Sequence, residues 1–208
     1  MLKRRPPFWL ALIYGAVLLV GVYMIFHAYT VHKYMMELKN TPLNQSQGAQ
    51  DTDKIMVEFV DYRCSHCRAI HPVVKEVLRR NPDVKVVYRH YPIFKDTSLR
   101  EAQIALTAGL QGKFSEAHDY LMSRGEEPIT EEEVLGVVQR LGLDVEKFQN
   151  DRRGPEIGQY LVFNLDAMQA IGIYSTPIFI IDDVIFQPYS ADATPEMFEE
   201  ILEEVYGS

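Results

Sequence analysis

Two cysteines separated by two residues, Cys64 and Cys67, are the only cysteines in the 208-residue sequence. A disulfide stabilises a fold mainly by closing a long loop, and a bridge between these two residues closes a very short one. A pair this close is therefore predicted to do chemistry, either as a redox-active dithiol or as part of a metal site.

A metal site would combine Cys64, Cys67 and His71. Structural zinc takes four ligands, and no second pair of cysteines or histidines supplies the remainder. Haem attachment through a CxxCH motif is excluded because Arg68 follows Cys67. Redox chemistry without a metal or other cofactor is the favoured prediction, and an inert pair of thiols is the remaining alternative.

The elements around the pair predict that Cys64 lies where a strand gives way to a helix. Residues 54–60 are rich in Ile, Val and Phe, which predicts a buried strand. Residues 67–80 place apolar side chains on one helical face, and residues 84–91 predict a second strand. This order within about forty residues predicts a βαβ unit with parallel strands and a right-handed crossover.

A helix amino terminus favours a thiolate because it presents free N–H groups and the positive end of the macrodipole. A protonated His66 would add positive charge beside the sulfur. Cysteines in such places have pKa values of roughly 3.5–7.5 instead of about 8.5. Cys64 precedes the first helical turn, is expected to be exposed, and is predicted to be the attacking sulfur. Cys67 is predicted to resolve the mixed disulfide.

Residues 96–172 are predicted to form a helical insertion. Thr130 and Glu133 have the spacing of a capping box. Four apolar residues spaced four, four and three apart predict one buried helical stripe: Ile157, Leu161, Leu165 and Met168. His90 and His118 are expected to be packing or surface residues.

Strand character returns after Gly172 in residues 177–181 and 184–186, which predicts a hairpin. Thr194 and Pro195 predict the cap and first position of a last helix through Tyr206. The predicted order is therefore β-α-β, a helical insertion, then β-β-α.

Residues 8–26 contain no charge, and as a helix they would span roughly 28 Å, close to the thickness of a hydrocarbon core. A signal peptide usually has a shorter apolar region and a small-x-small cleavage site. An uncleaved anchor is therefore predicted, with a cleaved signal and a buried core helix as alternatives. Lys3, Arg4 and Arg5 would stay in the cytoplasm, which exports everything after residue 30.

Three regions follow from these patterns: a cytoplasmic tip and transmembrane anchor over residues 1–30, a linker over residues 31–52, and a catalytic domain over residues 53–208. The anchor helix is expected to reach about residue 39, and residues 42–48 are predicted to be flexible. Residues 51–208 carry 16 Lys and Arg against 28 Asp and Glu, a net charge of −12. This acidity argues against a nucleic-acid partner, because phosphate contacts need clustered basic side chains.

The sequence Glu-Phe-Val-Asp-Tyr-Arg-Cys-Ser-His-Cys at 58–67, followed by Ser-Thr-Pro-Ile-Phe at 175–179, resembles the DsbA-like oxidoreductases of bacterial cell envelopes. The resemblance covers about residues 53–205 and is specific as a combination. It implies an α/β, thioredoxin-like fold with a helical insertion, here preceded by one transmembrane helix. Together with the apolar segment at residues 8–26, it predicts an anchor in the bacterial inner membrane and a catalytic domain on the periplasmic side.

The resemblance implies roles for individual residues. His66 is similar to the histidine that stabilises the active-site thiolate. Pro177 looks like the cis-proline beside the disulfide, which leaves the backbone at Thr176 free to bind an extended substrate strand. Glu58 matches the buried acid that relays the proton of Cys67, and its alternative is an ordinary strand glutamate.

Three further positions bear on the resemblance. Pro72 resembles the proline that kinks this helix in thioredoxin-like proteins. Ser65 and Thr176 depart from classical DsbA, which has proline and valine there. Threonine before the proline is more typical of the isomerase branch and of many anchored DsbA-like proteins.

The leading functional prediction is an enzyme that donates its disulfide to exported cysteine-containing proteins and is reoxidised by a DsbB-like membrane partner. One alternative is a reductase or isomerase kept reduced by a DsbD-like partner. A different class is a membrane-tethered binding or chaperone module in which the disulfide is incidental.

Overall fold

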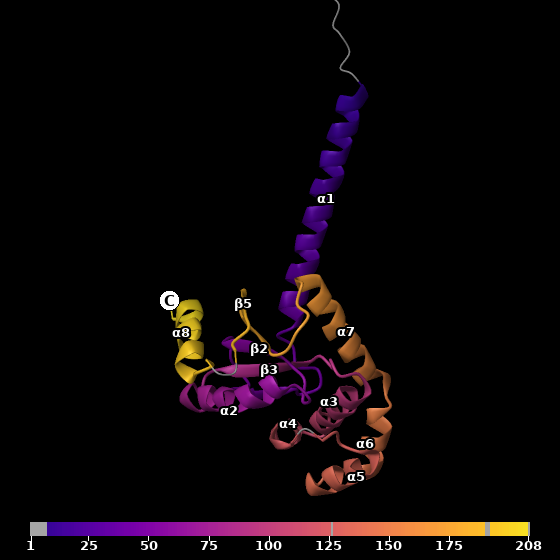
Figure 1. Cartoon of the computed structure of the whole chain (residues 1–208), viewed down its shortest axis with the longest axis vertical. Helices are drawn as coiled ribbons and strands as arrows, with labels where there is room; N and C mark the ends of the chain where they lie inside the picture. The colour runs from indigo at the N-terminus through magenta and orange to yellow at the C-terminus, as the bar shows by residue number, and fades with distance from the viewer. Residues whose placement is uncertain (1–7, 126, 190–191, 208) are drawn as a thin grey trace, which may run out of the picture.

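The structure, a computed structural model, describes residues 8–125, 127–189 and 192–207. A long helix rises from a domain in which helices cover a mixed sheet (Figure 1). Lys3, Arg4 and Arg5, on which the predicted membrane orientation depends, lie outside the described residues.

The sheet has five strands in the order β1-β3-β2-β4-β5. Their bounds are β1 Ser46–Gly48, β2 Ile55–Val60, β3 Lys85–His90, β4 Ile178–Ile181 and β5 Val184–Phe186. β2 and β3 are parallel and are connected through helix α2, Ser65–Arg80, which confirms the predicted βαβ unit. β4 runs antiparallel to β2 and pairs with β5 in the predicted hairpin.

The helical insertion contains five of the helices. They are α3 Asp96–Gly109, α4 Phe114–Ser123, α5 Glu131–Arg140, α6 Val145–Arg152 and α7 Pro155–Ile171. Thr130 and Glu133 form the predicted capping box at the start of α5. Helix α8, Pro195–Tyr206, closes the domain, and the Thr194 hydroxyl accepts a hydrogen bond from its first turn as predicted.

Two apolar cores lie on the two faces of the sheet. The larger core joins the sheet to α2, α4, α5 and α8, and the smaller one joins it to α7 and the residues that follow the long helix. The predicted stripe of α7 is wrong at Leu165, which is 38% exposed. The helix instead turns Tyr160 and Asn164 inward with Ile157, and the polar groups of both bond to β3, at the main-chain oxygens of Tyr88 and His90.

Helix α1, Phe8–Glu37, continues beyond its apolar part, as predicted. Its most apolar stretch has no residue buried inside the molecule, which excludes a core helix and leaves a membrane span or a signal sequence. The prediction of a flexible linker over residues 42–48 is wrong, because Leu43 and Gln45 are buried and β1 pairs with the edge of β3. Hydrophobicity gave little signal for this strand because it consists of Ser, Gln and Gly.

Candidate active site

Cys64 and Cys67 lie where β2 ends and α2 begins. Cys64 is the N-cap residue of α2, with an extended backbone, and Cys67 is buried in the first helical turn. The Cys64 N–H donates to the Asp61 carbonyl, and the Cys64 carbonyl accepts the first helical hydrogen bond from Arg68. Both are free cysteines, so the structure represents the dithiol form.

The expectation that Cys64 is exposed is wrong, because only 6% of the residue is accessible. The loop that precedes β4 covers it, and the Cys64 sulfur lies 3.4 Å from the main-chain oxygen of Thr176, to which it donates only while it is protonated. Cys64 still lines a surface pocket of about 480 Å³, together with Ser65 and His66. A reaction partner therefore reaches this sulfur through the pocket.

The two sulfurs have opposite acidities. A hydrogen bond from the Cys67 thiol lowers the pKa of Cys64 to about 5, with help from the main-chain N–H groups of Cys67 and His66, although burial opposes the shift. Burial raises the pKa of Cys67 well above its usual value, and its thiol–thiolate hydrogen bond to Cys64 raises it further. At neutral pH the pair therefore holds one thiolate, on Cys64, and one thiol, on Cys67.

Glu58 lies inside the sheet on β2 and is 1% exposed. Burial raises its pKa to about 8, and the negative charge on Cys64 adds to the shift. Its Oε1 atom has no hydrogen-bond partner among the described residues. A carboxyl group of this kind can take up and release a proton near neutral pH, which favours the predicted relay over the alternative of an ordinary strand glutamate.

The remaining predicted residues gather around the same sulfur. The Thr176–Pro177 peptide bond is cis, and Thr176 is buried against Cys64. Pro72 lies inside helix α2. His66 is exposed and lines the pocket. The structure thus brings Cys64, Cys67, Glu58, His66, Thr176 and Pro177 together.

Asp61 is a buried acid that sequence reasoning missed. Its two carboxylate oxygens accept hydrogen bonds of 2.7 Å from the N–H groups of Arg63 and Ile93. It therefore ties the loop before Cys64 to the loop after β3. Burial raises its pKa, although these hydrogen bonds favour the charged form. The available signal was its position directly after a buried strand and three residues before the first cysteine.

A buried network of rings lies behind the cysteines. The Tyr62 hydroxyl lies 2.9 Å from Nε2 of His90 and 2.9 Å from Nδ1 of His118. His71, the third residue of the alternative metal site, pairs with Asp119 at 3.2 Å. Within the described ranges no group of three or more His, Cys, Asp or Glu side chains has the geometry to hold a metal ion.

Exposed apolar side chains form one wall of the pocket. Ile93 and Phe94 follow β3, and Tyr174 precedes the proline loop; they are 38%, 52% and 70% exposed. Arg63 and Arg68 line the same pocket. The surface around the reactive sulfur is therefore partly apolar and partly basic.

Known proteins share this arrangement. Residues 55–203 match the family described as "DSBA-like thioredoxin domain". A thioredoxin-like oxidoreductase from Silicibacter pomeroyi DSS-3 is 28% identical with a TM-score of 0.74, over 83% of this chain and 97% of that one. The protein named "Probable disulfide bond formation protein D" from Bacillus anthracis is 28% identical over 156 residues, covering 69% of this chain and 72% of the relative.

A Na⁺/H⁺ antiporter NhaA from Salinispora tropica is also similar, at 30% identity over 142 residues. The match covers 65% of this chain and 21% of the antiporter, so the chain spans about a fifth of that relative's length.

Sulfur chemistry with one stabilised thiolate and one protonated thiol, built on a thioredoxin-like fold, defines a thiol–disulfide oxidoreductase. Within that class, the chain belongs to the DsbA-like thioredoxin-domain family. The predicted fold class and enzyme class are both confirmed.

Proposed function

We propose that the protein is a dithiol oxidase of the cell envelope that transfers its Cys64–Cys67 disulfide to exported proteins. The observation that carries this direction is the pKa of about 5 at Cys64. A low thiolate pKa stabilises the reduced enzyme, and a stabilised reduced form makes the disulfide a stronger oxidant.

The proposed reaction moves two electrons from client to enzyme. A client thiolate attacks the sulfur of Cys64, which forms a mixed disulfide and breaks the Cys64–Cys67 bond. Cys67 leaves as a thiolate and takes a proton, which Glu58 supplies. A second client thiolate then attacks the client sulfur of the mixed disulfide, so that the client gains a disulfide and Cys64 leaves as a stabilised thiolate.

Glu58 also serves the reverse step, in which a membrane partner reoxidises the enzyme. Cys67 must then lose its proton to displace the partner from Cys64, and its own pKa is too high for spontaneous ionisation at neutral pH. A carboxylate with a pKa of about 8 is close enough to neutrality to accept that proton. A DsbB-like protein is the proposed oxidant, and a DsbD-like protein would replace it in a reductase.

Client proteins are proposed to bind across the pocket wall formed by Ile93, Phe94 and Tyr174. Exposed apolar side chains of this size suit unfolded chains, which still expose their own apolar residues. The backbone at Thr176, with Pro177, is proposed to hold an extended client segment beside Cys64. His66 is proposed to stabilise the thiolate from the exposed side of the pocket.

Helix α1 is proposed to anchor the domain in the bacterial inner membrane, with the amino terminus in the cytoplasm and the catalytic domain outside it. Its apolar stretch is long enough to span a bilayer and lies outside the core of the domain. A thiolate held at Cys64 suits an oxidising compartment, where dithiols are converted to disulfides.

The test is the reduction potential of the full chain in lipid nanodiscs, equilibrated with glutathione buffers. We expect a potential in the oxidising range, about −120 to −180 mV, as known oxidising members of this class have. A value of about −270 mV would contradict the oxidase and support the reductase. Ser65 and Thr176, which depart from classical DsbA, are the reason to test this alternative.

A second measurement separates the enzyme from a binding module. The redox state of Cys64 and Cys67 in intact cells should be mostly oxidised, and Cys64→Ala should abolish disulfide transfer to a reduced client. A Ser175→Ala variant, which changes the same loop without touching the thiols, serves as the matched control. If Cys64→Ala retains disulfide transfer, the enzyme assignment at this pair is wrong.

A further inference from the structure

We propose that Arg89 locks helix α1 onto the catalytic domain, so that the anchor and the active-site domain form one rigid body. A membrane-embedded redox partner would then meet Cys64 in one fixed orientation. The second statement rests on the proposed function, whereas the rigid connection stands on its own contacts.

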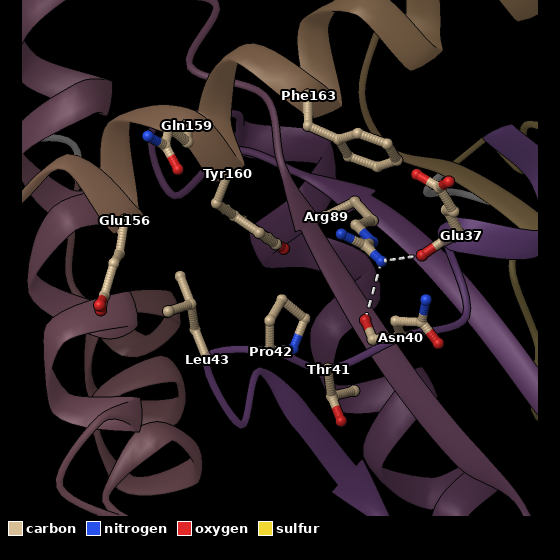
Figure 2. Close-up of a pocket in the computed structure, with 10 residues that line it drawn as sticks. All are labelled: Glu37, Asn40, Thr41, Pro42, Leu43, Arg89, Glu156, Gln159, Tyr160 and Phe163. Atoms are coloured by element: carbon tan, nitrogen blue, oxygen red, sulfur yellow. Dashed lines mark hydrogen bonds between the residues drawn. The ribbon is translucent and has the colours of Figure 1, made fainter.

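Arg89 lies on β3 with its guanidinium turned toward the end of α1 (Figure 2). Its Nη2 donates to the main-chain oxygens of Glu37 and Asn40 at 2.7 and 2.8 Å, and its Nε donates to that of Leu38 at 2.9 Å. The residue is 1% exposed although it carries a full charge. Burying an arginine is costly unless its donors are used, so this one is well explained as a specific connector.

The carboxyl end of a helix is where a buried cation is most useful. The last carbonyl groups of a helix have no partner within it, and the aligned peptide dipoles place partial negative charge there. Arg89 satisfies carbonyl groups of Glu37, Leu38 and Asn40, at the end of α1 and in the turn after it, with a single side chain. The contact therefore joins the anchor to the central sheet rather than to a surface loop.

Helix α7 completes the lock from the other side. The guanidinium lies over the rings of Tyr160 and Phe163, at 5.3 and 5.5 Å from their centroids. Phe163 in turn packs against Tyr34 of α1, with ring centroids 5.5 Å apart. Asn164 accepts from Arg89 at 3.4 Å and donates to β3. The buried guanidinium of Arg89 on β3 therefore contacts both α1 and α7.

The segment that follows α1 is also held. The Asn44 side chain donates to the main-chain oxygen of Gly109, and the Gln45 amide donates to that of Asn40. Lys39 pairs with Asp182 at 2.8 Å. A hinge in residues 38–48 would break contacts to α3, to the β4–β5 turn and to the edge of β3.

A pocket of about 880 Å³ opens beside Arg89, between residues 40–43 and α7 (Figure 2). Water therefore reaches the boundary between the anchor and the domain. Apolar packing at this boundary is limited to the smaller core, where Tyr34, Met35 and Leu38 meet α7. Removing the guanidinium should therefore loosen the boundary while the sheet and its larger core stay folded.

If α1 is rigidly joined to the domain, the length of α1 sets how the catalytic domain is oriented relative to the membrane. Thirty helical residues extend about 45 Å, and a hydrocarbon core takes about 30 Å. About 15 Å of helix therefore stands between the bilayer and Arg89. Along such a stalk, each residue turns the domain by about 100° around the membrane normal.

Protease access tests the rigid connection in the full chain in nanodiscs. Lys39 is the only tryptic site between residues 34 and 53, so release of a fragment that begins at Asn40 reports opening of the lock. We expect the wild type to resist cleavage there and Arg89→Met to be cleaved at least about tenfold faster. Arg153→Met, at an exposed arginine, is the matched control and should behave as the wild type. Rapid cleavage of the wild type at Lys39 would overturn the proposal.

Alanine insertions after Ala28 test the orientation without changing the core. Two residues turn the domain by about 200°, and four return it to within about 40° of its starting direction. After a pulse of dithiothreitol in cells, reoxidation of Cys64 and Cys67 should slow at least tenfold with two alanines and much less with four. Equal rates in both variants would show that the partner does not need a fixed orientation.

If Arg89→Met fails to fold, the alanine insertions still test whether the redox partner needs the domain in a fixed orientation. The rate of thiol–disulfide exchange between each variant in nanodiscs and a small dithiol measures the activity of Cys64 and Cys67 without the membrane partner. Loss of that exchange in the wild type would refute the proposed function and leave the protease result, and with it the lock, intact.

Discussion

The sulfur of Cys64 lies 3.4 Å from the main-chain oxygen of Thr176, a residue 112 positions further along the chain. The register of the sheet explains this approach. Phe59 of β2 is paired with Ile178 of β4, and the two strands are antiparallel. The residues just after β2 and just before β4 therefore lie at the same end of the two strands. The reactive sulfur and the proline loop therefore owe their contact to strand pairing, and the helical insertion between them does not disturb it.

Cys67→Ala should raise the pKa of Cys64. The hydrogen bond from the Cys67 thiol is the largest contribution that lowers this pKa to about 5, and alanine cannot donate it. The pH dependence of iodoacetamide alkylation at Cys64 measures the value. We expect a midpoint near pH 5 in the reduced wild type and a clearly higher midpoint in the variant.

Cys64→Ala is the control for that titration. The remaining thiol, Cys67, is buried and its pKa lies well above the usual value, so alkylation near neutral pH should nearly cease. An unchanged midpoint in Cys67→Ala would mean that the helix terminus, rather than the neighbouring thiol, sets the acidity of Cys64.

Glu58→Gln should slow disulfide exchange at neutral pH because it removes the proposed proton acceptor for Cys67. General acid–base catalysis contributes roughly 10²–10⁴-fold in enzymes, and we expect a loss of tenfold or more in the resolution of a mixed disulfide. Stopped-flow reoxidation by a small disulfide measures this step. Alkylation of Cys64 at neutral pH should change little, which distinguishes a lost relay from a damaged thiolate.

The same substitution should stabilise the fold. A carboxyl group with a folded pKa of about 8 and a usual value of 4.5 keeps a proton that the unfolded chain releases, so its contribution to stability falls as the pH rises between these values. At pH 7 this amounts to about 3 kcal/mol, which glutamine does not incur. Urea unfolding of the reduced protein should show the gain at pH 7, and the gain should vanish below pH 4.5.

The strands and the helix around the cysteines were predictable because they combine hydrophobic periodicity with turn residues. The capping box at Thr130 was equally predictable, since it depends only on residues close to it in the sequence. The edge strand β1 was not, because its Ser-Gln-Gly sequence is stabilised by pairing with β3 and by a hydrogen bond from Gln47 to Asp119 of α4, which are distant in the sequence.

The site shows the same division between local and distant causes. The helix terminus, whose N–H groups contribute to the low Cys64 pKa, could be inferred from residues 58–67, but the larger contribution of the Cys67 thiol was not. The burial of Cys64 could not, because Thr176 covers it from another part of the chain. The Tyr62 contacts with His90 and His118 likewise depend on packing between β3 and α4, which no spacing in the sequence encodes.

Acid should destabilise the protein through His90 and His118. Burial lowers the pKa of His90 to about 3 and that of His118 well below its usual 6.5, so both rings stay neutral while the unfolded chain takes up protons. Stability is therefore lost as the pH falls below 6.5. Each ring contributes a slope that approaches about 1.4 kcal/mol per pH unit.

Glu58 has the opposite slope between pH 4.5 and 8. The Cys64 thiol, with a pKa of about 5 in the folded protein, adds a slope of the same sign as the rings down to about pH 5. The measurement therefore belongs in the Glu58→Gln background with Cys64 and Cys67 oxidised to the disulfide. Urea unfolding at a series of pH values from 6.5 to 4.5 gives the slope. Adding His90→Gln should remove about half of it. A free energy of unfolding that does not change over this range would show that the rings accept protons in the folded state.

Two glycine substitutions should have opposite effects on stability. Gly109 ends α3 under the main chain of Leu43, and an added Cβ would overlap with the Leu43 oxygen. Gly109→Ala should therefore destabilise the protein by roughly 1–3 kcal/mol and loosen residues 43–45. Gly136 lies inside α5 with open space around its Cα, so Gly136→Ala should stabilise it by roughly 0.5–1 kcal/mol. Urea unfolding compares the two, and a stabilising Gly109→Ala would show that residues 43–45 are not packed against α3.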